Sequence, residues 1–136
     1  MTEKDNIPEM RSSFDDLRRQ DENGNIYWSS RDLSAAMGYS AYWKFQKVID
    51  KAIRAAGEKG MNVDEHFNQA VDMVKIGSGS FRKVSIFRLS KMACMIVAEN
   101  ADAKKLLVKQ ARAYFSETLP INDLMQNALT SNILLY

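Results

Sequence analysis

The chain is poor in the side chains that form metal sites and cross-links. Its 136 residues include one cysteine, Cys94, and one histidine, His66. A single cysteine excludes an internal disulfide, and it does not combine with His66 in any familiar zinc spacing. Cys94 lies in the apolar run MACMIVA, which is typical of a buried, inert thiol rather than a nucleophile. We therefore expect no metal ion and no other cofactor.

Long hydrophobic runs are missing as well. No segment approaches the roughly 18 uncharged apolar residues of a membrane-spanning helix, and the acidic start MTEKDNIPEM has no signal-peptide pattern. Apolar residues make up 46% and charged residues 26%, which favours one conventional globular domain over a disordered or coiled-coil chain. We expect a soluble cytoplasmic protein without a membrane partner.

Catalytic motifs are also absent, since the sequence contains no G-x-S-x-G, H-E-x-x-H or G-x-G-x-x-G pattern. His66 stands beside Asp64 and Glu65, but a general base needs a nucleophile or a metal, and neither is visible nearby in the sequence. We predict that the protein is not an enzyme and that His66 is structural.

Periodicity predicts an α+β fold, mostly helical with one or two short β-hairpins and no βαβ repeat. Helices are expected over residues 12–19, 31–37, 40–60, 90–100 and 101–118, with the following residues of the last turned inward: Leu106, Leu107, Ala111, Tyr114 and Phe115. Ser30 is expected to cap the second helix and Gly38 to close it, and Gly57 and Gly60 to end the third. A turn at 20–25 precedes a strand at 26–28. A second hairpin joins strands 71–76 and 84–87, with Arg82 and Lys83 at a flexible, glycine-rich tip.

The positive charge is concentrated in one part of the sequence. The whole chain carries a formal charge of +2, yet residues 75–115 hold nine lysines and arginines against Glu99 and Asp102 alone. Such a segment is typical of a phosphate-binding face, because each cation near a nucleic acid releases condensed counterions. A basic surface balanced in space by acidic segments is the alternative.

Aromatic residues accompany the cations at the start of the helix predicted over 40–60. Tyr42 and Trp43 lie next to Lys44 and Lys47, a composition suited to stacking bases or contacting backbone phosphate, and we expect one of the two rings to be exposed. Together with the basic hairpin, this pattern predicts a nucleic-acid-binding surface. The residues predicted to contact the nucleic acid are Arg31, Trp43, Lys44, Lys47, Arg54, Lys75, Arg82, Lys83, Arg88 and Lys91.

An ordered set of short segments is shared with a known family. These are WSSRDL at 28–33, MGYS at 37–40, VDEHF at 63–67, MVKIGS at 73–78 and the Tyr114-Phe115 pair. In this order the chain resembles the Bro N-terminal domain family of phage antirepressor-like proteins, and within it the DNA-damage-inducible proteins of bacteria. The resemblance implies a small α+β DNA-binding module that acts in a DNA-damage response or on a mobile element.

The expected organisation has three parts. Residues 1–11 form a flexible N-terminus, residues 12–118 the Bro-N-like DNA-binding domain, and residues 119–136 a C-terminal amphipathic helix. That helix either docks on the domain or pairs with a second copy, because its end is too apolar to lie free in water. The alternative function is therefore a protein-interaction or homodimerisation module that modulates a DNA-repair or transcription-regulatory partner. The docking residues are Ile133, Leu134, Leu135 and Tyr136.

Overall fold

A computed structural model describes residues 13–116 and shows an α+β domain built on one four-stranded antiparallel sheet with the strand order β1-β2-β4-β3. A short helical segment at 13–16 precedes the sheet, and a helix over 106–116 follows the last labelled element. None of the helices in this range is long and apolar enough to cross a membrane. The labelled elements are β1 (Arg19–Gln20), β2 (Ile26–Ser29), α2 (Ser30–Ala36), α3 (Tyr42–Glu58), α4 (Val63–His66), β3 (Phe67–Lys75), β4 (Phe81–Leu89) and α5 (Lys91–Asn100).

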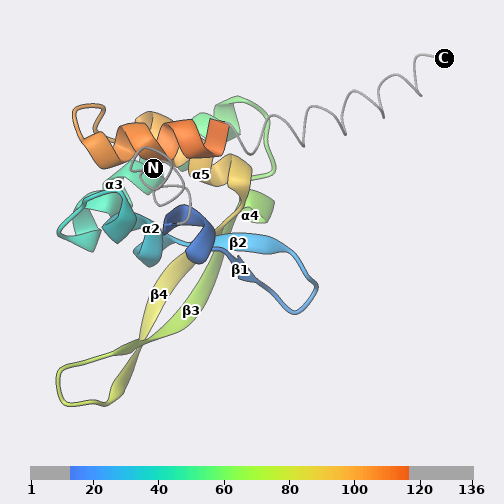
Figure 1. Ribbon diagram of the computed structural model, residues 1–136. Coiled ribbons are helices and arrows are strands. Elements are labelled where there is room, and N and C mark those ends of the chain that lie inside the picture. Colours follow the sequence, from blue (N-terminus) through green and yellow to red (C-terminus); the bar gives the residue numbers. More distant parts are fainter. Residues whose placement is uncertain (1–12, 117–136) are drawn as a thin grey trace, which may run out of the picture.

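The core lies where the helices cover the inner end of the sheet (Figure 1). Trp28 of β2 is fully buried, and its indole N–H donates a hydrogen bond of 2.9 Å to the carbonyl of Phe14. Phe115 lies edge-on to the Trp28 ring, with 5.2 Å between ring centres. Helices α3 and α5 pack against each other through buried apolar residues such as Ile49 and Val97. Aromatic rings from both ends of the described chain thus close the domain.

The hairpin of β3 and β4 is longer than the core requires. Figure 1 shows its outer part extending away from the helices as a twisted two-stranded ribbon. The pairing runs without interruption from Phe67 opposite Leu89 to Lys75 opposite Phe81. At the tip the N–H of Ile76 donates to the carbonyl of Ser80 at 2.8 Å. We call residues 71–85 the arm.

Several expectations are confirmed and others are wrong. The α+β class, the first turn and the helix capped by Ser90 are confirmed, the last by a 3.0 Å bond from the N–H of Ala93 to the Ser90 hydroxyl. The first helix is shorter than expected because β1 begins at Arg19. Gly57 does not end its helix but lies inside α3.

The basic hairpin also differs from its prediction. Arg82 and Lys83 are not at a flexible tip, since both pair with β3 inside strand β4. The predicted inward side of the last helix is confirmed for Ala111, Tyr114 and Phe115, which are buried, but it is wrong for Leu106 and Leu107, which are 66% and 40% exposed. Residues 1–11 and the end of the chain with Ile133 to Tyr136 lie outside the described residues.

Gly38 closes α2 as predicted, and its backbone requires glycine. Its φ is +84°, and the N–H of Tyr39, the residue after it, donates to the carbonyl of Ser34 at 3.0 Å. A Cβ at this position would also come within 3.2 Å of the Leu107 side chain. Gly77, in contrast, has no positive φ and no neighbour within 4 Å of such a Cβ.

We predict that Gly38→Ala lowers the free energy of unfolding by about 1–2 kcal/mol, because alanine is strained in the left-handed region. Gly77→Ala, the matched control, changes it by less than about 0.5 kcal/mol. Urea unfolding followed by circular dichroism measures both. Equal unfolding midpoints for the two variants would contradict the prediction.

Candidate nucleic-acid interface

The outer face of α3 gathers four of the predicted site residues. Trp43 is 57% exposed, whereas Tyr42 is half-buried, so one ring of the pair is exposed as expected. The ammonium groups of Lys44 and Lys47 lie 5.6 and 5.2 Å from the centre of the Trp43 ring. Arg54 follows on the same exposed side about two turns further along. The first turns of α3 thus present an aromatic face with two cations beside it.

Tyr42 connects this helix to the sheet. Its hydroxyl lies 2.6 Å from the hydroxyl of Ser30, which also accepts a 2.9 Å hydrogen bond from the N–H of Phe87 in β4. The expectation that the Ser30 side chain caps α2 is wrong, since the N-cap residue is Ser29 and no side chain bonds there. The guanidinium of Arg31 lies 4.2 Å from the centre of the Tyr42 ring, which places this predicted residue at the same corner.

A groove of about 350 Å³ separates the start of α3 from the base of the arm. Tyr42 and Gln46 line it from the helix. From the hairpin it is lined by residues that include Gln69, Val71, Ser85 and Phe87. These four are paired across the two strands and therefore share one face of the ribbon.

That face continues outward along the arm. By strand alternation it carries the cross-strand pairs Met73 with Lys83 and Lys75 with Phe81. Val71 is 61%, Met73 51% and Phe81 61% exposed. Lysines and large apolar side chains therefore alternate on a surface that no other element covers within residues 13–116.

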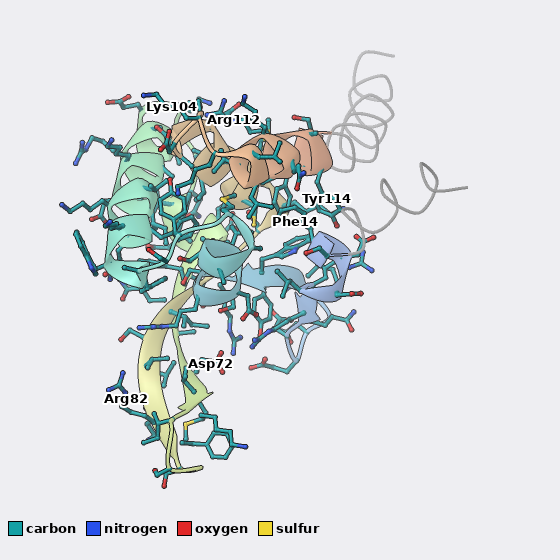
Figure 2. The ribbon with its side chains drawn as sticks, turned by 60° about the vertical axis from the view of Figure 1, so that its left-hand side comes forward. Phe14, Asp72, Arg82, Lys104, Arg112 and Tyr114 are labelled. Carbon is teal, nitrogen blue, oxygen red and sulfur yellow. The ribbon has the colours of Figure 1, made fainter. Side chains whose placement is uncertain are left out.

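The opposite face of the hairpin is anchored to the domain. Val84 and Ile86 are buried there. The carboxylate of Asp72 forms an ion pair with the guanidinium of Arg19, with 3.3 Å between the nitrogen and the oxygen. Arg19 also pairs with Asp32 of α2 at 2.7 Å. Burial by itself lowers the pKa of the Arg19 guanidinium. The two carboxylates favour its charged form more strongly, so the pKa lies above its ordinary value. Arg82 shares this side of the ribbon and projects from the outer arm (Figure 2).

Two of the predicted residues lie elsewhere. Arg88 lines a separate hollow of about 730 Å³ together with Asp21, Asp64 and Glu65. Its guanidinium lies 4.9 Å from the Tyr27 ring centre and 3.8 Å from the carboxylate of Glu22. Lys91 begins α5, at the end of β4 opposite the tip. The structure therefore does not bring these two cations to the face formed by α3 and the arm.

Few of the cations within residues 13–116 form ion pairs with carboxylates. Within residues 13–116 the ion pairs are those of Arg19 with Asp32 and Asp72 and of Arg88 with Glu22. No carboxylate in that range lies within ion-pairing distance of the following predicted residues: Arg31, Lys44, Lys47, Arg54, Lys75, Arg82, Lys83 and Lys91. Among the described residues, these cations thus carry charge that no ion pair offsets.

His66 has a partner that sequence reasoning missed. Its Nδ1 lies 2.6 Å from the hydroxyl of Ser90, although the two residues are 24 positions apart. The same hydroxyl caps α5 by accepting a hydrogen bond from the N–H of Ala93, so its role is structural.

Cys94 is fully buried, and burial raises the pKa of its thiol well above the ordinary value. No group of three potential metal ligands occurs in the part of the chain that the structure describes.

Fold and surface together define a small α+β domain with a basic face and a projecting two-stranded arm. No family model matches the chain, so membership of the Bro N-terminal family is not confirmed, and no solved structure matches it. The chain is similar to the DNA damage-inducible protein D of Escherichia coli strain K12, with 36% identity over 103 residues. The match covers 76% of this chain and 38% of the relative, so the chain spans well under half of that protein's length. The expected likeness to bacterial DNA-damage-inducible proteins is confirmed.

We predict that Ser30→Ala lowers the free energy of unfolding by about 1–3 kcal/mol, because it leaves the N–H of Phe87 without its acceptor. Ser29→Ala is the matched control. The Ser29 hydroxyl is buried and has no hydrogen-bond partner among residues 13–116, so its removal costs nothing or stabilises slightly. Urea unfolding and the amide hydrogen exchange of Phe87 measure the two variants. Equal losses in both would show that the Ser30 hydroxyl does not hold this junction.

Proposed function

We propose that this domain binds DNA through the outer face of α3 and the arm, in the setting of a DNA-damage response, and that it does so without catalysis. The likeness to a protein named for induction by DNA damage supports the setting. The placement of the cations supports the mode of binding, and this observation carries the proposal.

The electrostatic support comes from two elements that are distant in sequence. Lys44 and Lys47 lie on the exposed side of α3 and Lys83 on the exposed face of the arm, and within residues 13–116 no carboxylate pairs with them. A polyanion long enough to reach both elements gains from all of them, whereas a single small anion reaches only one group. Phosphates spaced along a nucleic acid backbone have the required repeat of charge.

The start of α3 adds to this attraction. The N-cap residue Ala41 has no side chain that bonds the first N–H groups, and the first turn contains no acidic residue. Free N–H groups at a helix N-terminus favour a bound phosphate, and here they lie close to Lys44. The exposed Trp43 ring offers a base or a sugar a flat apolar contact.

The non-catalytic part of the proposal rests on how the reactive side chains are held. Ser90 and His66 form the one close hydroxyl–imidazole pair in the described range, and the hydroxyl is occupied as the cap of α5. Cys94 is buried in the core. We assign the pair of Ser90 and His66, and also Cys94, to structural roles.

The salt dependence of binding tests the proposal. Fluorescence anisotropy of a labelled duplex between about 50 and 200 mM salt should show log affinity falling linearly with log salt. In the double variant Lys44→Gln and Lys47→Gln the slope should decrease by about two, because two phosphate contacts are lost. Absence of binding by the unchanged protein at the lowest salt would refute DNA binding.

The matched control removes two other exposed lysines. Lys104→Gln with Lys109→Gln changes the net charge equally, and Figure 2 shows Lys104 at the end of the domain opposite Arg82. Its slope should equal that of the unchanged protein. Equal loss of slope in both double variants would mean that net charge, rather than the face of α3, determines binding.

A further inference from the structure

The apolar side chains of the arm are not explained by phosphate contacts. Five large hydrophobic residues in the described range are more than half exposed, and three of them, Val71, Met73 and Phe81, share one face of the arm. Phosphate binding needs only cations and N–H groups. Exposure of this kind on a single face indicates a contact with something apolar.

The shape of the arm allows it to enter a narrow space. From Val71 to Lys75 the strand extends about 13–17 Å at the usual rise per residue, before the tip is added. The tip itself is made of small residues, Gly77, Ser78, Gly79 and Ser80. A φ of +87° at Gly79 and the bond between Ile76 and Ser80 keep the turn tight. The arm is thus a thin ribbon whose turn between Ile76 and Phe81 holds only small residues.

The charge of the outer arm favours a nucleic acid over another protein surface. Residues 73–83 contain Lys75, Arg82 and Lys83 and no acidic residue. Asp72, at the inner end, is held by Arg19 on the anchored face. Alternating lysines and apolar groups match a partner with stacked apolar bases flanked by two rows of phosphate.

We propose that the arm enters the minor groove of duplex DNA and that Phe81 and Met73 wedge between stacked base pairs. This inference rests on the proposed DNA binding and specifies which groove the protein enters and how it contacts the bases. Side chains such as Phe and Met unstack base steps from the minor groove, whereas reading of the major groove uses Arg, Lys, Asn or Gln. The outer part of the apolar face holds no Arg, Asn or Gln, and each of its two lysines is paired across the strands with Met73 or Phe81. Lys75, Lys83 and Arg82 contact the phosphates on both sides of the widened groove.

The wedge has a measurable consequence that does not depend on DNA sequence. Partial intercalation unwinds duplex DNA, so relaxation of a closed circular plasmid by topoisomerase I in the presence of the full chain should shift its linking number. Phe81→Ala should abolish that shift at matched saturation of the DNA. It should also weaken duplex binding about tenfold, as expected for the loss of one stacking contact.

The control is an exposed hydrophobic residue at the other end of the domain. Leu106 is 66% exposed on the helix over 106–116, so Leu106→Ala removes similar surface but should keep both the affinity and the linking-number shift. Netropsin, which occupies the minor groove, should displace the protein, and methyl green, which occupies the major groove, should not.

The outcomes separate the two proposals. If the unchanged protein binds DNA with the expected salt slope but produces no linking-number shift, or if Phe81→Ala still produces it, the wedge is wrong and DNA binding stands. If the unchanged protein does not bind at all, DNA binding itself is wrong. If sedimentation shows that Phe81→Ala converts a dimer into a monomer while DNA binding is unaffected, the apolar face is a protein contact and the wedge is overturned.

Discussion

The relative placement of the helix and the arm depends on one buried hydroxyl. Strand β2 ends at Ser29, so the next backbone group of the central strand β4, the N–H of Phe87, has no strand partner on that side. The hydroxyl of Ser30 replaces the missing carbonyl at 2.9 Å and at the same time contacts the hydroxyl of Tyr42. A buried N–H without an acceptor is costly, so this bond is strongly favoured. Sheet, α2 and α3 therefore meet at a fixed angle, and the groove beside the arm follows from it.

Three arginines take structural roles in the fold. Arg19 bridges two carboxylates, Arg88 lies over a tyrosine ring, and Arg112 donates to the carbonyls of residues 98, 99 and 101 at the end of α5. The planar guanidinium has several donors in fixed directions, which suits such structural bonding. Most lysines remain at the surface, where a compact, hydrated ammonium group costs nothing to leave exposed. A count of charge along the chain treats both types alike and so overstates the cations that are free to bind a ligand.

The sequence predicts which elements exist better than which faces they cover. Helical periodicity located α3, and Ser90 and Gly38 marked a helix start and end because capping and positive φ are local requirements. A strand over 71–76 implies that residues 71 and 73 share one face and Asp72 the other, but the sequence does not show that Arg19 and α2 anchor the Asp72 side. That choice is made by packing between distant segments, and it left Val71, Met73 and Phe81 exposed. The pairing of His66 with Ser90 and the role of Ser30 were missed for the same reason.

Anchoring on one face explains how the arm holds an apolar surface in water. An isolated two-stranded ribbon is marginally stable, but here Val84 and Ile86 are buried and Asp72 is tied to Arg19 on the inner face. The ladder of hydrogen bonds then continues to the pair of Lys75 and Phe81. Because the backbone is already ordered by this ladder, binding needs to order only side chains, and less conformational entropy is lost than in a flexible loop. Exposure of Met73 and Phe81 to water is unfavourable as long as no ligand covers them. Their position on the ordered arm is therefore best explained by a partner that buries them.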